Sequence, residues 1–177
     1  MLNTFEIPSP YPAQVGTGKV ITRQKVLFVC SSNASLSQLG AAFFRYFDPE
    51  SSRFEVYSAG SGPRVANRLH PLAAAMIEEL GQDSNKIRPK ALSEFCNTTF
   101  DYVFIVGVEA NSAYQAGKLS LPETKRVLVW PFPDPALISP YLQPHYFQQV
   151  GDSMYQLVRN LLKLPNFAGA QIPQPIH

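Results

Sequence analysis

Cys30 stands where an apolar run meets a short loop of small residues, and a helical pattern follows the loop at once. The loop residues are Ser31, Ser32, Asn33, Ala34, Ser35, Leu36 and Ser37. A loop between a strand and a helix N-terminus points backbone N–H groups at a common centre, where they bind tetrahedral oxyanions. The same field favours the thiolate of a cysteine, which is the nucleophilic form. The segment therefore predicts a thiol nucleophile beside an oxyanion-binding loop.

Most side chains of this loop suit an anion site. The serines and Ala34 are small enough to let an anion approach, and Asn33 tolerates a left-handed backbone. Ser37 is placed to hydrogen-bond the thiolate or to cap the helix. Leu36 does not fit, because it stands where such chemistry calls for a cation. An inert cysteine at a strand end is the alternative interpretation of Cys30, since free cysteines are often buried.

Short apolar runs alternate with helical patterns along the chain. Strands are predicted over residues 25–30, 54–57, 102–106 and 126–130, and helices over residues 35–47, 71–80 and 146–164, with a short helix at 92–95. This alternation implies an α/β fold with a parallel sheet and right-handed crossovers. Function in such sheets resides at the carboxyl ends of the strands. Cys30 and Asp134 each follow a strand, so they can meet at one edge of the sheet.

The helix predicted over residues 35–47 carries an apolar stripe, mostly at steps of three and four. Its expected inward residues are Leu36, Leu39, Phe43, Tyr46 and Phe47. Leu36 is therefore expected to pack inward rather than to face the loop.

The composition is that of one globular domain with two extensions. The chain has 177 residues, of which 45% are hydrophobic and 16% charged, and this length can bury a sizeable core. We assign residues 23–164 to a single domain, residues 1–22 to an N-terminal arm and residues 165–177 to a C-terminal tail. The arm and the tail could serve a partner or a homodimer interface, although disorder is the simpler interpretation.

Several classes of function are not indicated. A net charge of +2 without a long basic run argues against a nucleic-acid surface. No apolar stretch approaches the roughly 20 residues of a membrane helix, and the N-terminus lacks a secretory pattern. Two distant cysteines, Cys30 and Cys96, favour a reducing cytoplasm over a disulfide framework. There is no Cys/His cluster at zinc spacing, and we expect neither a metal nor another cofactor.

Several segments, in order, resemble the low-molecular-weight tyrosine phosphatase superfamily, and most of all its thioredoxin-coupled arsenate reductase branch. The resemblance covers roughly residues 25–164. It rests on the segments VLFVCSSN, AAFFRYF, VYSAG, HPLAAAMIEELG, RPKAL, FDYVFIV and FPDPA. It implies a three-layer, flavodoxin-like and phosphatase I-like fold, in which a four-stranded parallel sheet of order 2-1-3-4 has helices on both faces.

The resemblance also implies roles for individual residues. Cys30 matches the nucleophile that attacks phosphorus or arsenic, and residues 31–37 match the oxyanion loop. Ser37 matches the serine that stabilises the thiolate. Asp134 matches the general acid that protonates the leaving group, although Asp-Pro is also ordinary turn chemistry.

The sequence departs from the family pattern at Leu36. The family motif is a cysteine, five residues and an arginine, and Leu36 is the sixth residue after Cys30. That arginine binds two oxygens of the anion with a planar fork of donors, which no aliphatic side chain can replace. Losing one such donor costs about 10²–10³ in rate.

Other cations could substitute for the missing arginine. Arg64, Arg68, Arg88 and Lys90 lie in predicted loops that could border the crevice, although solvated surface charge is the simpler interpretation of each.

The redox cysteines of the arsenate reductase branch are also missing. Gly107 and Tyr114 stand at the matching positions. Arsenate reduction coupled to thioredoxin is therefore not expected. Cys96 lies elsewhere, and we predict for it a buried structural role.

Three functions follow from these residues. The first is an impaired member of the family that binds an oxyanion or a phosphorylated protein partner. The second is an active, cysteine-dependent phosphomonoesterase with a relocated cation. The third is a thiol-based redox or regulatory module. We favour the first because of Leu36.

Overall fold

The computed structural model describes residues 22–168. Nearly all of the predicted arm and most of the predicted tail lie outside these residues. No helix within residues 22–168 is both long and apolar enough to cross a membrane.

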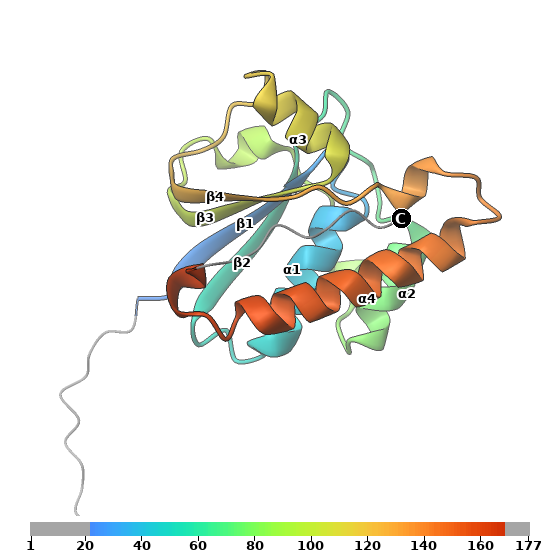
Figure 1. The fold of residues 1–177 in the computed structure, drawn as a ribbon, viewed down its shortest axis with the longest axis horizontal. Coiled ribbons are helices and arrows are strands. Elements are labelled where there is room, and N and C mark those ends of the chain that lie inside the picture. The colour runs from blue at the N-terminus through green and yellow to red at the C-terminus, as the bar shows by residue number, and fades with distance from the viewer. Residues whose placement is uncertain (1–21, 169–177) are drawn as a thin grey trace, which may run out of the picture.

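Four parallel strands form a single sheet (Figure 1). The strands are β1 (Gln24–Cys30), β2 (Phe54–Gly60), β3 (Phe100–Val106) and β4 (Thr124–Trp130). β1 pairs with β2 on one side and with β3 on the other, and β4 flanks β3. This order, β2-β1-β3-β4, confirms the predicted fold. The last five residues of β1 are all buried, as expected of a central strand that is covered on both faces.

Helices cover both faces of the sheet, as Figure 1 shows. One face carries α1 (Leu36–Phe47), α2 (Pro71–Glu79) and α4 (Gln143–Leu161), and the other carries α3 (Val108–Gln115). Short 3-10 turns are η1 (Ser84–Lys86), η2 (Leu92–Phe95), η3 (Pro135–Leu137) and η4 (Pro165–Phe167). The sequence did not predict α3, because that helix buries a single side chain, Ala110, and has no apolar stripe. α4 begins and ends three residues earlier than predicted.

The core between the sheet and α1 is aromatic. The ring of Phe28 in β1 stacks on Phe104 with centroids 4.8 Å apart and meets the edge of Phe44 at 5.0 Å. Gly40 brings α1 close to this strand, since a Cβ there would lie 2.6 Å from Cδ1 of Phe28. Phe167, which falls in the predicted tail, is buried with its ring 4.5 Å from that of Tyr102.

The inward face of α1 is shifted slightly from the predicted stripe. Leu36, Leu39 and Phe43 are buried as predicted, but Tyr46 is 45% exposed and Phe44 is buried. The prediction for Tyr46 was wrong because Tyr46 lies about 160° around the helix axis from Phe44, the residue that faces the core at this end of the helix. The helix therefore begins at the loop with Leu36 already facing the core.

Candidate active site

Cys30 ends β1, and its side chain is buried. Its Sγ lies 2.9 Å from Oγ of Ser37, and the N–H of Asn33 donates to it at 3.3 Å. Burial raises the pKa of the Cys30 thiol. The Ser37 hydroxyl and the N–H groups of Ser37 and Asn33 act in the opposite sense, and the Asp134 carboxylate adds to the rise. The net pKa is therefore above its ordinary value, and the neutral thiol is favoured.

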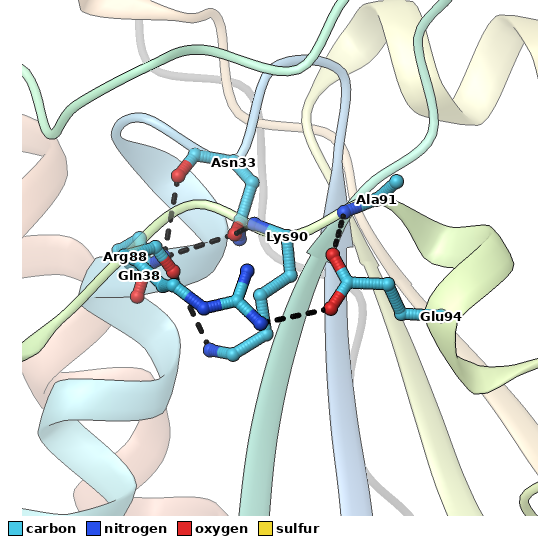
Figure 2. Close-up of polar contacts among 6 residues, drawn as sticks. All are labelled: Asn33, Gln38, Arg88, Lys90, Ala91 and Glu94. Atoms are coloured by element: carbon cyan, nitrogen blue, oxygen red, sulfur yellow. Dashed lines mark hydrogen bonds and ion pairs between the residues drawn. The ribbon is translucent and has the colours of Figure 1, made fainter.

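Asn33 holds the loop in shape. It is fully buried with φ of 57°, the left-handed conformation that its type tolerates. Its Nδ2 donates to Ser37 Oγ at 2.8 Å. Its Oδ1 accepts from the Lys90 N–H at 2.8 Å and from Gln38 Nε2 at 3.0 Å (Figure 2). One side chain thus connects the cysteine loop, α1 and the segment before η2.

The carbonyl groups of the loop are bound from outside. Ser31 and Ser32 accept from the N–H groups of Gly62 and Ala66 at 2.8 and 2.9 Å. Ala34 accepts from the N–H of His70 at 2.9 Å. The N–H groups of Ser31, Ser32 and Ser35, by contrast, have no backbone acceptor within residues 22–168. Unpaired N–H groups ahead of a helix are the donors that an oxyanion needs.

Asp134 lies against the same loop. Its Oδ1 accepts from Ser35 Oγ at 3.0 Å and from the N–H of Ala136 at 3.0 Å, which makes it the N-cap of η3. The carboxylate is 8% exposed. The structure thus brings Asp134 and the Cys30 loop to one edge of the sheet.

Leu36 points into the core. It is 1% exposed and packs with the apolar residues of α1, β1 and β3. Its Cδ1 lies 3.0 Å from where a Cβ on Gly107 would stand, and Gly107 has φ of 111°. The Asp134 carboxylate is the charged group that shifts the pKa of Cys30, and it raises this pKa. No cation within residues 22–168 lowers the pKa of Cys30.

The four cations considered from the sequence lie away from the thiol's immediate contacts. Arg64 and Arg68 are exposed. Arg88 pairs with Glu94 at 3.0 Å, and Lys90 Nζ lies 3.4 Å from the Arg88 carbonyl oxygen. Only the backbone N–H of Lys90 contacts the loop.

The chain matches the family model of the low molecular weight phosphotyrosine protein phosphatases over residues 25–164. It belongs to this family.

Solved structures have the same fold. The tyrosine phosphatase Wzb from Escherichia coli K30, in complex with sulphate, is 18% identical with a TM-score of 0.58, over 79% of this chain and 99% of that one. Wzb from Vibrio vulnificus, in complex with benzylphosphonate, is 18% identical with a TM-score of 0.54, over 79% and 100%. The arsenate reductase from Archaeoglobus fulgidus DSM 4304 is 24% identical with a TM-score of 0.54, over 76% and 98%.

This member of the phosphatase family has its second thiol at the surface. Cys96 is exposed, which contradicts the predicted buried role. It directly follows η2, whose buried residues are Leu92 and Phe95, so the next side chain faces outward. Gly107 is the N-cap of α3 and Tyr114 lies within this helix, so the two positions at which redox cysteines were considered hold no thiol.

The sequence did not point to Gln38 as a residue of the site. Gln38 is 1% exposed, and its Nε2 donates to both the carbonyl oxygen and Oδ1 of Asn33, at 3.3 and 3.0 Å. The sequence feature that could have identified it is a glutamine beside the buried stripe of an apolar helix, because a buried amide needs hydrogen-bond partners. No pattern in the sequence predicts the contact between Ser35 and Asp134.

Proposed function

We propose that this protein is a catalytically impaired member of its family, a pseudophosphatase that binds a phosphate-like oxyanion or a phosphorylated protein partner. The observation that carries the proposal is the buried side chain of Leu36 at the first position of α1. A guanidinium in its place would bind two oxygens of the anion and stabilise a thiolate. Leucine does neither.

The state of Cys30 supports the same conclusion. We assign Cys30 to the position of the nucleophile, and a nucleophile must be a thiolate. Its pKa is raised by burial, so the weaker, neutral form is favoured at neutral pH. The same raised pKa gives no support to a function as a reactive redox thiol.

The loop keeps the donors that anion binding needs, whichever role Asp134 has. We assign Asp134 to the position of the general acid, which must present a proton to the leaving group. Its Oδ1 accepts hydrogen bonds from Ser35 and Ala136, so Oδ2 is the oxygen that could carry this proton. Meanwhile the N–H groups of the loop remain as donors for an oxyanion.

An active phosphomonoesterase with a relocated cation is the second candidate. The contacts of Cys30 with Ser37 and of Asp134 with Ser35 favour it, because nucleophile, thiol donor and acid are all adjacent.

Hydrolysis of p-nitrophenyl phosphate separates the two candidates. The proteins to compare are the wild type, Cys30→Ser, Leu36→Arg and, as a matched control of similar volume, Leu36→Met. We expect background rates for the wild type and for Leu36→Met, and a rise of about 10²–10³ for Leu36→Arg. Wild-type turnover at rates normal for the family, lost in Cys30→Ser, would overturn the proposal in favour of the second candidate.

Binding at the loop is measured separately, from the amide chemical shifts of residues 31–37 during titration with inorganic phosphate. The proposal requires that the wild type bind the anion at the loop without hydrolysing the ester. A wild type with neither activity nor anion binding at the loop contradicts it.

A further inference from the structure

A shallow groove with a volume of about 530 Å³ lies beside the loop, on the α1 side of the sheet. Gln38 and Arg45, two turns apart on α1, form one wall. The segment from Gly81 to Lys90 forms the other, and Gln82 ties the two walls together by donating to the Ala42 carbonyl at 2.8 Å. Cys30 is not among the lining residues, so the groove is separate from the candidate active site.

Two half-buried cations of this groove have no carboxylate partner. Within residues 22–168, Asp83 pairs with Lys86 at 3.3 Å and Glu94 pairs with Arg88. No carboxylate lies within ion-pair distance of Arg45 or Lys90 in the same part of the chain. Arg45 donates to the Val56 carbonyl at 3.0 Å, which leaves most of its donors unused.

The positive charges of Arg45 and Lys90 also repel one another. Burial lowers the pKa of Lys90, and the charges of Arg88 and Arg45 lower it further against the opposing effect of Glu94. Burial likewise lowers the pKa of Arg45. Partly desolvated like charges facing one groove are relieved by a bound anion.

One wall of the groove holds an acceptor that is closed to solvent in the described structure. Gln38 Oε1 is buried without a hydrogen-bond partner in the described structure, while its Nε2 is committed to Asn33. This fixes the orientation of the amide, because the reverse orientation would set an oxygen against the two oxygens of Asn33. A buried acceptor without a donor is rare in native proteins and calls for an explanation. A ligand that donates a hydrogen bond supplies one.

From these observations we infer that the groove is a second anion site, which binds a small phosphate-bearing molecule that also carries a hydroxyl or acid proton. Arg45 and Lys90 contact the phosphate oxygens, and the proton is donated to Gln38 Oε1 as the Gln38 side chain moves toward the groove. The volume suits a small molecule such as a phosphorylated sugar.

This site communicates with the loop of Cys30. Gln38 and Lys90 both donate hydrogen bonds to Oδ1 of Asn33 (Figure 2). Asn33 in turn contacts the Cys30 thiol through its N–H. A ligand that draws Gln38 or Lys90 toward the groove therefore changes the contacts that shape the loop. Effects between the two sites must be reciprocal.

The test is a titration of the ¹⁵N-labelled full chain with inorganic phosphate and with ribose 5-phosphate, followed by amide chemical shifts. We expect shifts at the amides of Gln38, Lys86 and Lys90, and we expect these shifts to persist in Cys30→Ser. Lys90→Gln weakens this binding by about tenfold or more, because a charge-assisted contact is lost. Lys118→Gln, at an exposed lysine outside the groove, leaves it unchanged.

Sulfate separates the role of the charge from that of the proton. At neutral pH inorganic phosphate keeps a proton and sulfate has none, so sulfate should bind the groove more weakly. Equal affinities for phosphate and sulfate would overturn the assignment of Gln38. Shifts confined to residues 31–37, or equal binding by Lys90→Gln and the wild type, would overturn the site itself while leaving anion binding at the loop intact.

Discussion

Replacing Asn33 with alanine should destabilise the protein through its candidate site. The amide makes three hydrogen bonds, at 2.8, 2.8 and 3.0 Å, and the residue is fully buried. Removing it leaves the Lys90 N–H without an acceptor and takes from the Gln38 amide one of its two acceptors, the other being the Asn33 carbonyl oxygen at 3.3 Å. Each buried N–H left unpaired costs about 1–3 kcal/mol, and a left-handed alanine costs roughly 1 kcal/mol more than asparagine. Two such N–H groups and the backbone strain together give an expected loss of about 3–7 kcal/mol.

Urea denaturation and thermal unfolding measure this loss. For a chain of this length, each kcal/mol lowers the melting temperature by about 2–4 °C, so the expected shift is roughly 6–28 °C. Asn33→Gly removes the same amide without the left-handed strain and should recover at most about 1 kcal/mol. Asn33→Asp keeps the acceptor for Lys90 and Gln38 and loses the donor to Ser37, so it should fall between the alanine variant and the wild type.

Either of two results would contradict this prediction for Asn33. A loss below about 1 kcal/mol for Asn33→Ala would mean that water replaces the amide without cost. Full recovery by Asn33→Gly would mean that backbone strain, not the hydrogen bonds, accounts for the loss.

Two further predictions concern ionisation. The pKa of Asp48 lies below its ordinary value. Burial raises this pKa, but the N–H groups of Arg53 and Phe54, the Ser52 hydroxyl and the Arg53 charge lower it by more. The stabilisation is present above the unfolded pKa of about 3.9 and is lost as pH falls through the folded value. Asp48→Asn should therefore lower the free energy of unfolding by about 1–3 kcal/mol at neutral pH. Urea denaturation at acidic pH should show a smaller difference in stability between this variant and the wild type. A difference that does not change with pH would contradict the stabilising role of the Asp48 carboxylate. For Cys30, the rate of iodoacetamide labelling in a Cys96→Ser variant should rise with pH around a midpoint above about 8.5, the pKa of a free thiol. Ser37→Ala should move this midpoint to higher pH. A midpoint below about 8.5 would refute the raised pKa of Cys30.

The sequence was sufficient where one pattern dominated. The apolar run of β1, the small residues after it and the stripe of α1 predicted the strand, the loop and the inward turn of Leu36. α3 escaped prediction because a polar helix that buries only Ala110 has no periodicity to detect.

Contacts between distant segments were harder to predict. The bond between Ser35 and Asp134 and the bonds of Gln38 to Asn33 depend on the packing of whole elements. The exposure of Cys96 depends on the single turn of η2, which composition does not determine.

The bond between Ser35 and Asp134 has a consequence for the order of folding. It joins residues 99 positions apart, and the bond from Lys90 to Asn33 spans 57. Contacts of such long range form only after the loops between them have closed, which slows their formation. The cysteine loop therefore reaches its final shape late, after β4 has docked on β3 and η3 has formed. During synthesis on the ribosome the nascent chain cannot complete the site until Asp134 and Ala136 have emerged.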